Sequence, residues 1–238
     1  MREYWDDRAR EDAFHFSDQR QPYRHPDPEG FWAEGERELD AVLGSLGLEA
    51  GPGDRVLDVG CGLGRLTRAL APRVAHVTAL DVSPEMLSRA QELNAGLGNV
   101  EWVLGDGVTL GGIEDASFDA IVCHLVFEHL PDPALPLGYV SEFARVLKPG
   151  GWAAFGLSTD PDAHRVRRER SGQHSRRGFL QAMVGRTPSG QDEPEWVGAF
   201  VPLDALGATA MRAGLNLERI EGANTRWTFV AARRTRGA

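Results

Sequence analysis

Short apolar segments alternate with helical patterns between residues 55 and 158, and this alternation limits the possible fold more than any other feature. Five segments are typical of strands: RVLDVG, HVTALDV, NVEWVLGD, FDAIVCHL and GWAAFGLS. Parallel neighbours need a crossover connection, usually a helix, because a tight hairpin joins only antiparallel strands. The pattern therefore predicts an α/β fold with a doubly wound, mostly parallel sheet covered by helices on both faces.

The C-terminal part of the chain is expected to complete this sheet. PLDALGATAMRAG predicts an amphipathic helix, and LNLERIEG and RWTFVAA, joined by Ala-Asn-Thr, predict an antiparallel edge hairpin that brings the sheet to seven strands. Before them, LGYVSEFARVL predicts a helix that ends at Pro149, Gly150 and Gly151.

Composition and charge exclude several classes of protein. No run approaches the ~18 apolar residues of a membrane span, and the first residues, MREYWDDRARED, are unlike a signal peptide, so we expect a cytoplasmic protein. Cys61 and Cys123 are too few for a disulfide framework or a cysteine metal cluster. With 26 basic and 35 acidic residues, the net charge of −9 argues against nucleic acid and favours a small-molecule partner. We expect a monomer or a homodimer.

The segment Asp58-Val-Gly60-Cys-Gly62-Leu-Gly64 lies between a predicted strand and a predicted helix. Glycines at such a turn let the backbone approach a ligand closely. The spacing is G-x-G-x-G rather than the G-x-G-x-x-G of dinucleotide sites, which leaves an NAD-dependent oxidoreductase as a remote alternative. An acidic residue two positions before the first glycine suits a cationic ligand. Asp81 ends the second strand, where a carboxylate can accept both hydroxyls of a ribose.

Five ordered segments carry a resemblance to a known family: VLDVGCGLGRL, VTALDVSPEML, VLGDG, FDAIVCHLVFEHLPD and FARVLKPGG. In this order they resemble the class I S-adenosylmethionine-dependent methyltransferases, especially the small-molecule branch similar to the ubiquinone and menaquinone biosynthesis enzymes. The resemblance implies S-adenosyl-L-methionine as cofactor and S-adenosyl-L-homocysteine as product. It also implies four parts: an N-terminal helical, aromatic cap (1–50), a Rossmann-like cofactor-binding core (51–159), an inserted lid (160–200) and a C-terminal helix with the edge hairpin (201–238).

Cofactor roles are carried over from this resemblance. The turn after Asp58 would hold the methionine part, Asp81 the ribose, and Val82 and Met86 the two faces of the adenine, whose amine would donate to Asp106. Tyr4 and Trp5 would cover the cofactor, although packing of the N-terminus explains the same aromatics. The residues implied in cofactor binding are Asp58, Gly60, Cys61, Gly62, Gly64, Asp81, Val82, Met86, Gly105, Asp106, Gly107, His124, Tyr4 and Trp5.

The expected reaction is methyl transfer to an oxygen, nitrogen or carbon atom of a small molecule, in specialised metabolism, by in-line displacement. A protein that keeps the fold and cofactor but catalyses cyclisation or isomerisation, or only binds, is the alternative. Candidate bases are His129, His124 and Glu128, and each can instead be structural. Candidate acceptor contacts are His15, Trp32, Arg165 and Arg168. These arginines would bind a carboxylate or phosphate, unless their charged run is a solvated helix face.

Overall fold

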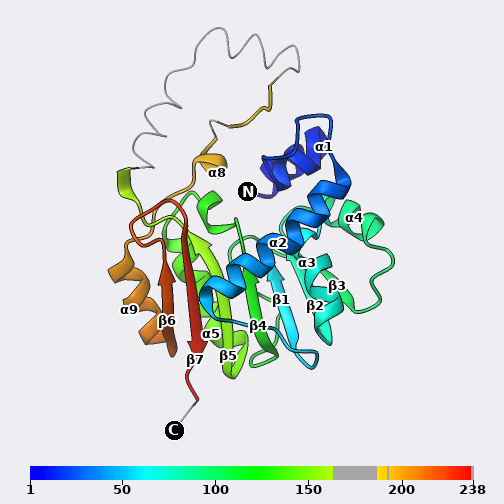
Figure 1. Cartoon of the computed structure of the whole chain (residues 1–238). Coiled ribbons are helices and arrows are strands. Elements are labelled where there is room, and N and C mark those ends of the chain that lie inside the picture. Colours follow the sequence, from blue (N-terminus) through cyan, green and yellow to red (C-terminus); the bar gives the residue numbers. More distant parts are fainter. Residues whose placement is uncertain (163–186, 192, 237–238) are drawn as a thin grey trace.

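A seven-stranded sheet forms the centre of the computed structural model, which describes residues 1–162, 187–191 and 193–236 (Figure 1). Its order is β3-β2-β1-β4-β5-β7-β6. The strands are β1 (Arg55–Val59), β2 (His76–Asp81), β3 (Val100–Leu104), β4 (Phe118–Cys123), β5 (Leu147–Leu157), β6 (Leu215–Glu221) and β7 (Thr228–Arg234). The first five pair in parallel, and β7 is antiparallel to both β5 and β6. The predicted fold class is confirmed.

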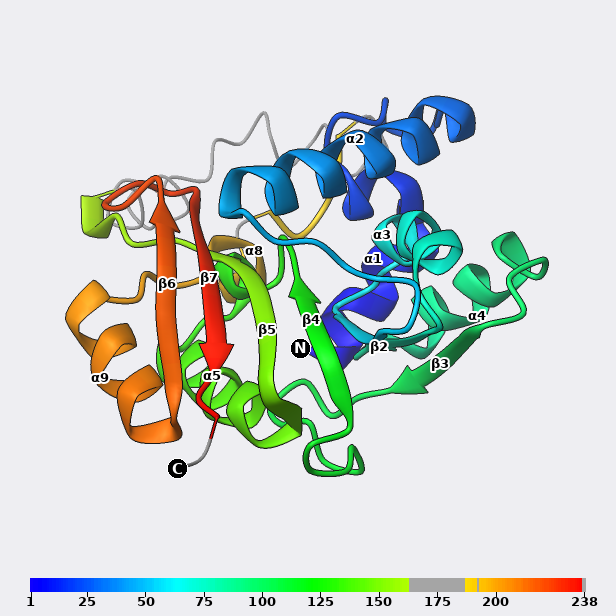
Figure 2. The same ribbon diagram turned by 60° about the horizontal axis from the view of Figure 1, so that its bottom comes forward.

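Helices cover both faces of this sheet. They are α1 (Arg2–Ser17), α2 (Pro28–Leu46), α3 (Arg65–Leu70), α4 (Pro84–Leu93), α5 (Ala134–Val146), α8 (Pro194–Val197) and α9 (Leu203–Ala213), with short 3-10 turns η1 (Ala71–Arg73) and η2 (Phe127–His129). One core cluster joins α2 and α3 to the sheet, and another joins α5 and α9 to its other face. In Figure 1, α2 crosses in front of the sheet, and Figure 2 shows α2 and α5 on different sides of it.

The strands alternate their side chains between these two clusters. On β4, Ala120 and Val122 pack with α2 and α3, whereas Ile121 and Cys123 pack with α5 and α9. This is the two-residue period of a strand. Both sets are apolar because both faces are covered, so the segment reads as a continuous apolar run.

Helix α2 lies within the predicted N-terminal cap (1–50), but in the structure it packs on the sheet as part of the core. The Asp27 side chain accepts a hydrogen bond from the Gly30 amide at 3.1 Å and caps its start, and Gly47 ends it in the left-handed conformation. Leu39 and Leu43 are buried against the sheet. The first 50 residues therefore contribute one helix, α2, to a face of the sheet and another, α1, that packs beside α4.

Two element boundaries differ from the sequence expectation. Strand β5 begins at Leu147 and includes Pro149, because Leu147 is fully buried and pairs with Phe118. The connection between β6 and β7 is longer than Ala-Asn-Thr, since β7 begins only at Thr228. The Trp227 amide donates to the Thr225 hydroxyl at 3.1 Å, so this part of the predicted strand belongs to the turn.

The expected lid, residues 160–200, lies partly outside the described residues, and with it Arg165 and Arg168. Its described end contains α8, whose buried Trp196 packs on Phe16 with the ring centroids 5.7 Å apart. Across residues 1–162, 187–191 and 193–236, we find no helix whose length and apolar character would let it cross a membrane.

Two glycines of α2 give a matched test of this packing. A Cβ on Gly35 would lie 2.6 Å from Cγ and 2.8 Å from the backbone oxygen of Arg65, whereas a Cβ on Gly44 would meet nothing within 4 Å. Gly44→Ala should therefore stabilise the protein by about 0.5–1 kcal/mol, and Gly35→Ala should destabilise it by about 1–3 kcal/mol. Urea unfolding measures both. Similar effects of the two substitutions would contradict the close approach of α2 and α3.

Candidate active site

A cavity of about 500 Å³ lies where β1, β2 and β4 end, and helices α1 and α2 and the β6–β7 loop contribute to its wall. Many of the residues predicted from the sequence line it. They are Trp5, Asp58, Gly60, Cys61, Gly62, Asp81, Val82, Met86, Gly107, His124, Glu128 and His129. Other predicted residues are not part of this wall: Tyr4, His15, Trp32, Gly64, Gly105 and Asp106.

The glycine turn is fixed to the neighbouring strand. The amides of Gly60 and Cys61 both donate to the carbonyl oxygen of Leu80, at 2.7 and 3.0 Å. Gly60 has a φ of +74°, and a Cβ there would lie 2.2 Å from Cγ2 of Val126. Only glycine allows the chain to pass this closely and in this conformation. The backbone of the turn therefore forms one wall of the cavity.

Asp81 is held by the backbone on both oxygens. Its Oδ2 accepts from the Gly62 amide at 2.8 Å and its Oδ1 from the Ser83 amide at 2.9 Å. The side chain is buried, and burial raises its pKa. Each carboxylate oxygen can accept more than one hydrogen bond, so both oxygens retain the capacity for a ligand hydroxyl. This geometry fits a ribose diol.

Asp58 is a second buried carboxylate beside the same turn. It is 1% exposed, and the Thr67 hydroxyl donates to its Oδ2 at 2.5 Å. Burial raises the pKa of Asp58 to about 6, and the charge of Asp81 adds to this rise. Among the described residues, neither aspartate forms a salt bridge. Two such carboxylates in one wall favour a cationic ligand, and S-adenosylmethionine carries a sulfonium and an ammonium group.

The Asp106 side chain is exposed and bonded within its own loop. Its Oδ1 accepts from the amides of Val108 and Thr109 at 2.8 and 2.7 Å, and its Oδ2 from the Thr109 hydroxyl at 2.6 Å. These hydrogen bonds hold its pKa below the usual value although partial burial opposes them. An adenine amine would have to compete with these bonds. The neighbouring Gly107, with a φ of +79°, does line the cavity.

Tyr4 and Trp5, the two aromatic residues of α1 that were predicted to cover the cofactor, point to different surroundings. Trp5 lines the cavity, with its ring edge-on to His129 at a centroid distance of 5.1 Å. The Tyr4 hydroxyl donates instead to the carbonyl oxygen of Gly190 at 2.9 Å. Asp6 anchors this helix by accepting from the Ser83 hydroxyl at 2.5 Å. Of the pair, Trp5 is the residue in position to contact a ligand.

His124 is bonded to a residue that the sequence analysis did not select. Its Nε2 lies 2.9 Å from Oε1 of Glu38, which projects from α2, while its Nδ1 is buried without a hydrogen-bond partner in the described structure. Glu38 also pairs with Arg65 and, at 2.8 Å, with Arg20. Burial alone would raise the pKa of Glu38, but the hydrogen bond and charge of His124 and the charge of Arg65 hold that pKa well below its usual value.

The remaining histidine candidates differ in environment. Nδ1 of His129 lies 3.2 Å from the Glu195 carbonyl oxygen, and its ring packs against Trp5 and Trp196. His15 lies outside the cavity wall, with its Nδ1 2.8 Å from the Gln21 carbonyl oxygen. Trp32, also outside, lies under the guanidinium of Arg68 at 4.6 Å. The last two residues are therefore packed within the N-terminal helices, away from the expected acceptor.

Comparison with known proteins identifies the domain. Residues 57–155 match the model of a methyltransferase domain. A ubiquinone biosynthesis O-methyltransferase from Xylella fastidiosa is 39% identical over an alignment of 182 residues, which covers 71% of this chain and 64% of that protein. The corresponding protein of Xanthomonas campestris is 35% identical over 155 residues, 60% of this chain and 62% of its own length. The chain thus spans less than two thirds of these curated relatives.

Solved structures share the fold at lower identity. A SAM-dependent methyltransferase from Aquifex aeolicus is 23% identical with a TM-score of 0.54, covering 87% of this chain and 98% of that one. The N-methyltransferase NodS from Bradyrhizobium japonicum is 20% identical with a TM-score of 0.56, covering 88% and 99%. The cyclase SpnF is 18% identical with a TM-score of 0.58, covering 85% and 81%. The fold alone therefore does not decide the chemistry.

Residues 57–155 form a methyltransferase domain, as the ordered motifs predicted. Its cofactor is S-adenosylmethionine, and its curated relatives are named for O-methylation in ubiquinone biosynthesis. The described geometry fits this cofactor through the glycine turn and the two buried carboxylates of Asp58 and Asp81.

Asp81 and Asp106 provide a matched pair for testing the cofactor site. Asp81→Ala should weaken S-adenosylhomocysteine binding by about 1.5–3 kcal/mol, because charge-assisted hydrogen bonds to the ribose are lost. Asp106→Ala should have a smaller effect, since its present bonds stay within one exposed loop. Titration calorimetry measures both affinities. A larger loss for Asp106→Ala in a folded protein would show that the two roles are exchanged.

Asp58 predicts that cofactor affinity depends on pH. Its pKa of about 6 in the free protein should fall when the cofactor's positive charge binds, so binding below pH 6 must release a proton. Affinity should therefore increase about tenfold from pH 5 to pH 7 and then level off. Asp58→Asn should bind more weakly and flatten this rise. Calorimetry in buffers of different ionisation enthalpy counts the released proton, and no release would refute the assignment.

Proposed function

We propose that this protein transfers the methyl group of S-adenosylmethionine to a hydroxyl oxygen of a small molecule, with His124 as the general base and Glu38 as its positioning residue. The observation that carries this proposal is the 2.9 Å contact between Nε2 of His124 and Oε1 of Glu38, in a histidine of the cavity wall whose Nδ1 has no partner among the described residues.

The protonation of the pair follows from its geometry. Glu38 is held in its ionised form by His124 and Arg65, and an ionised carboxylate can only accept hydrogen bonds. Nε2 of His124 must therefore carry the proton. His124 must lose its charge before it can act as a base, and Nδ1 of the resulting neutral imidazole is then an acceptor. Nδ1 is enclosed by the cavity wall, so it takes a proton from a hydroxyl group only when the imidazole turns toward the cavity.

Methyl transfer to a hydroxyl oxygen needs such a base, because a hydroxyl group is a weak nucleophile until its proton is removed. When bound, S-adenosylmethionine would supply an activated methyl group, and the S-adenosylhomocysteine thioether would keep the electron pair of the broken S–C bond. Nδ1 of His124 takes the hydroxyl proton as the O–C bond forms, and Glu38 stabilises the imidazolium that results. In this proposal, in-line placement of the acceptor and the methyl group supplies much of the acceleration.

Two further facts support oxygen as the acceptor atom. The curated relatives from Xylella and Xanthomonas are named as O-methyltransferases. An uncharged amine or a carboxylate needs no base, so a preformed carboxylate–histidine pair would have no task with those acceptors. Glu128 and His129 also line the cavity, and we assign them to its acceptor wall rather than to proton removal.

The acceptor atom can be identified before the acceptor molecule itself. Carbon-13 methyl-labelled S-adenosylmethionine is incubated with the protein and a metabolite extract of the source organism, and the chemical shift of the transferred methyl separates oxygen, nitrogen and carbon products. We expect an oxygen product. A labelled N-methyl or C-methyl group, or no product from broad extracts, would overturn the proposal.

With that acceptor, His124→Gln should lower kcat about 10²–10⁴-fold while cofactor affinity stays unchanged. The residual rate should rise with pH, because only an ionised oxygen reacts without a base. Glu38→Gln should lower kcat less and leave KM similar. His15→Gln is the control, since His15 is also buried but lies outside the cavity. Equal loss in the His15 and His124 variants would indicate a structural role.

A further inference from the structure

We propose that Arg226, in the loop between β6 and β7, binds a carboxylate of the acceptor and so selects anionic acceptors. This inference rests on the proposed function, because it assigns a second contact to the molecule that His124 deprotonates. It extends the anionic acceptor expected from the sequence to a residue that sequence analysis did not select.

Arg226 differs from the other arginines of the cavity wall in its partners. Arg20 pairs with Asp18 at 2.8 Å and with Glu34 at 2.7 Å, and Arg65 pairs with Glu38. Arg226 has no hydrogen bond or salt bridge to any described residue, and its Nε is buried without an acceptor. A guanidinium carries five N–H donors, and buried donors are normally paired. The terminal N–H groups of Arg226 are not buried, so a ligand in the cavity can bind them.

The position of Arg226 places it on the acceptor side of the cavity. The glycine turn follows β1, whereas the β6–β7 loop lies at the end of β5, where Leu157 pairs with Thr228. His124 follows β4, which lies between β1 and β5 in the sheet. Phe229, three residues after Arg226, stacks on His124 with the ring centroids 5.7 Å apart. An acceptor beside His124 can therefore reach Arg226 without crossing the cofactor turn.

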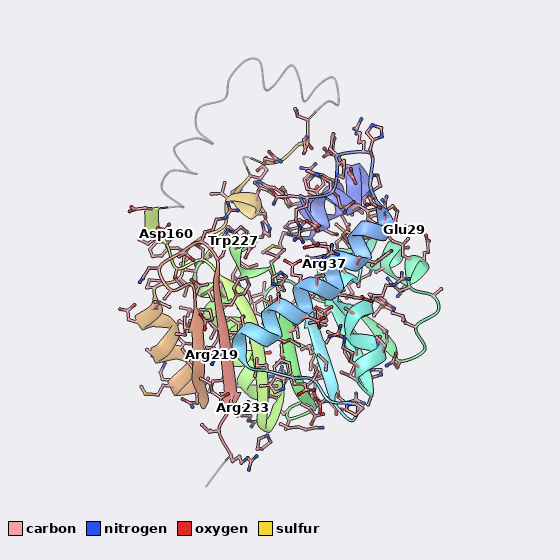
Figure 3. All side chains as sticks on the ribbon, in the orientation of Figure 1. Glu29, Arg37, Asp160, Arg219, Trp227 and Arg233 are labelled. Atoms are coloured by element: carbon pink, nitrogen blue, oxygen red, sulfur yellow. The ribbon has the colours of Figure 1, made fainter. Side chains whose placement is uncertain are left out.

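Trp227 determines which part of the guanidinium is free. The Cζ atom of Arg226 lies 4.8 Å from the centroid of the Trp227 ring, and this cation–π contact occupies one face of the group. The N–H groups point outward from the edge of the plane, which is the geometry that matches a carboxylate through two parallel hydrogen bonds. Figure 3 shows Trp227 at the end of the hairpin near α8. Trp227 is 47% exposed, so it also offers an apolar surface.

The loop that carries these side chains is held in place. The Thr228 hydroxyl donates to the Gly222 carbonyl oxygen at 2.8 Å, and the Thr159 amide donates to the Thr225 carbonyl oxygen at 3.0 Å. The Thr225 hydroxyl also donates to the Gly222 carbonyl oxygen at 2.6 Å. These bonds tie the loop to itself and to the residues after β5. A fixed loop reduces the entropy that ligand binding must remove.

The test measures equilibrium binding and needs no turnover, so it can fail independently of methyl transfer. The protein is saturated with S-adenosylhomocysteine and titrated with gallic, caffeic and ferulic acid and with the primary amide of each. We expect at least one acid to bind at least tenfold more tightly than its amide. Arg226→Gln should remove this preference, and Arg226→Lys should restore part of it, because lysine keeps the charge without the planar fork.

Controls separate this role from others. Arg219→Gln changes an exposed arginine lower on the same hairpin and should retain the acid preference (Figure 3). The affinity for S-adenosylhomocysteine should stay within twofold of wild type in every variant. The inference is overturned if no acid binds wild type more tightly than its amide, or if Arg226→Gln keeps the preference. Loss of S-adenosylhomocysteine affinity in Arg226→Gln and Arg226→Lys would also overturn it, because Arg226 would then hold the cofactor's own carboxylate.

Discussion

Two buried carboxylates at the ends of neighbouring parallel strands are the constraint on which the site depends. Asp58 and Asp81 are both withdrawn from water, and the charge of Asp81 raises the cost of ionising Asp58. The glycine turn offsets part of the cost of burying Asp81, because the Gly62 amide donates a hydrogen bond to its carboxylate. The remaining negative potential makes the cavity favourable for a cation. The strand pairing that builds the sheet thus also builds the charge preference of the site.

Helix α2 connects the stability of the fold to the chemistry of the cavity. Its apolar residues close one face of the sheet, and Gly35 lets it approach the backbone of Arg65 closely. From the same helix, Glu38 reaches His124, Arg20 and Arg65. A shift of α2 would therefore loosen the core and misplace the carboxylate together. This coupling gives a physical reason why the proposed positioning residue lies on a scaffold helix rather than in a loop.

The two sides of the cavity are assembled in different ways. Most of the cofactor side comes from short motifs next to β1, β2 and β3, where neighbouring residues act together. The other side combines η2 and the β6–β7 loop, which are far apart in the sequence. The same fold occurs in the N-methyltransferase NodS and in the cyclase SpnF, so the fold alone does not set the acceptor specificity. Arg226 and Trp227 belong to this second side.

Strand periodicity and the glycine turn are local features, so the sequence alone predicted the sheet, its helices and many of the residues that line the cavity. Residues such as Asp81 and Met86 could be placed from their distance to that turn. Glu38 could not, since one acidic residue on a polar helix face carries no local sign of its partner. Asp106 and Tyr4 were expected at the ligand, but the structure turns their polar groups toward a loop and toward Gly190. Arg226 was the first residue of the predicted strand RWTFVAA. In the structure it belongs to the turn before Thr228 and lines the cavity. Contacts between distant segments decided these cases, because they depend on how the helices and the hairpin pack.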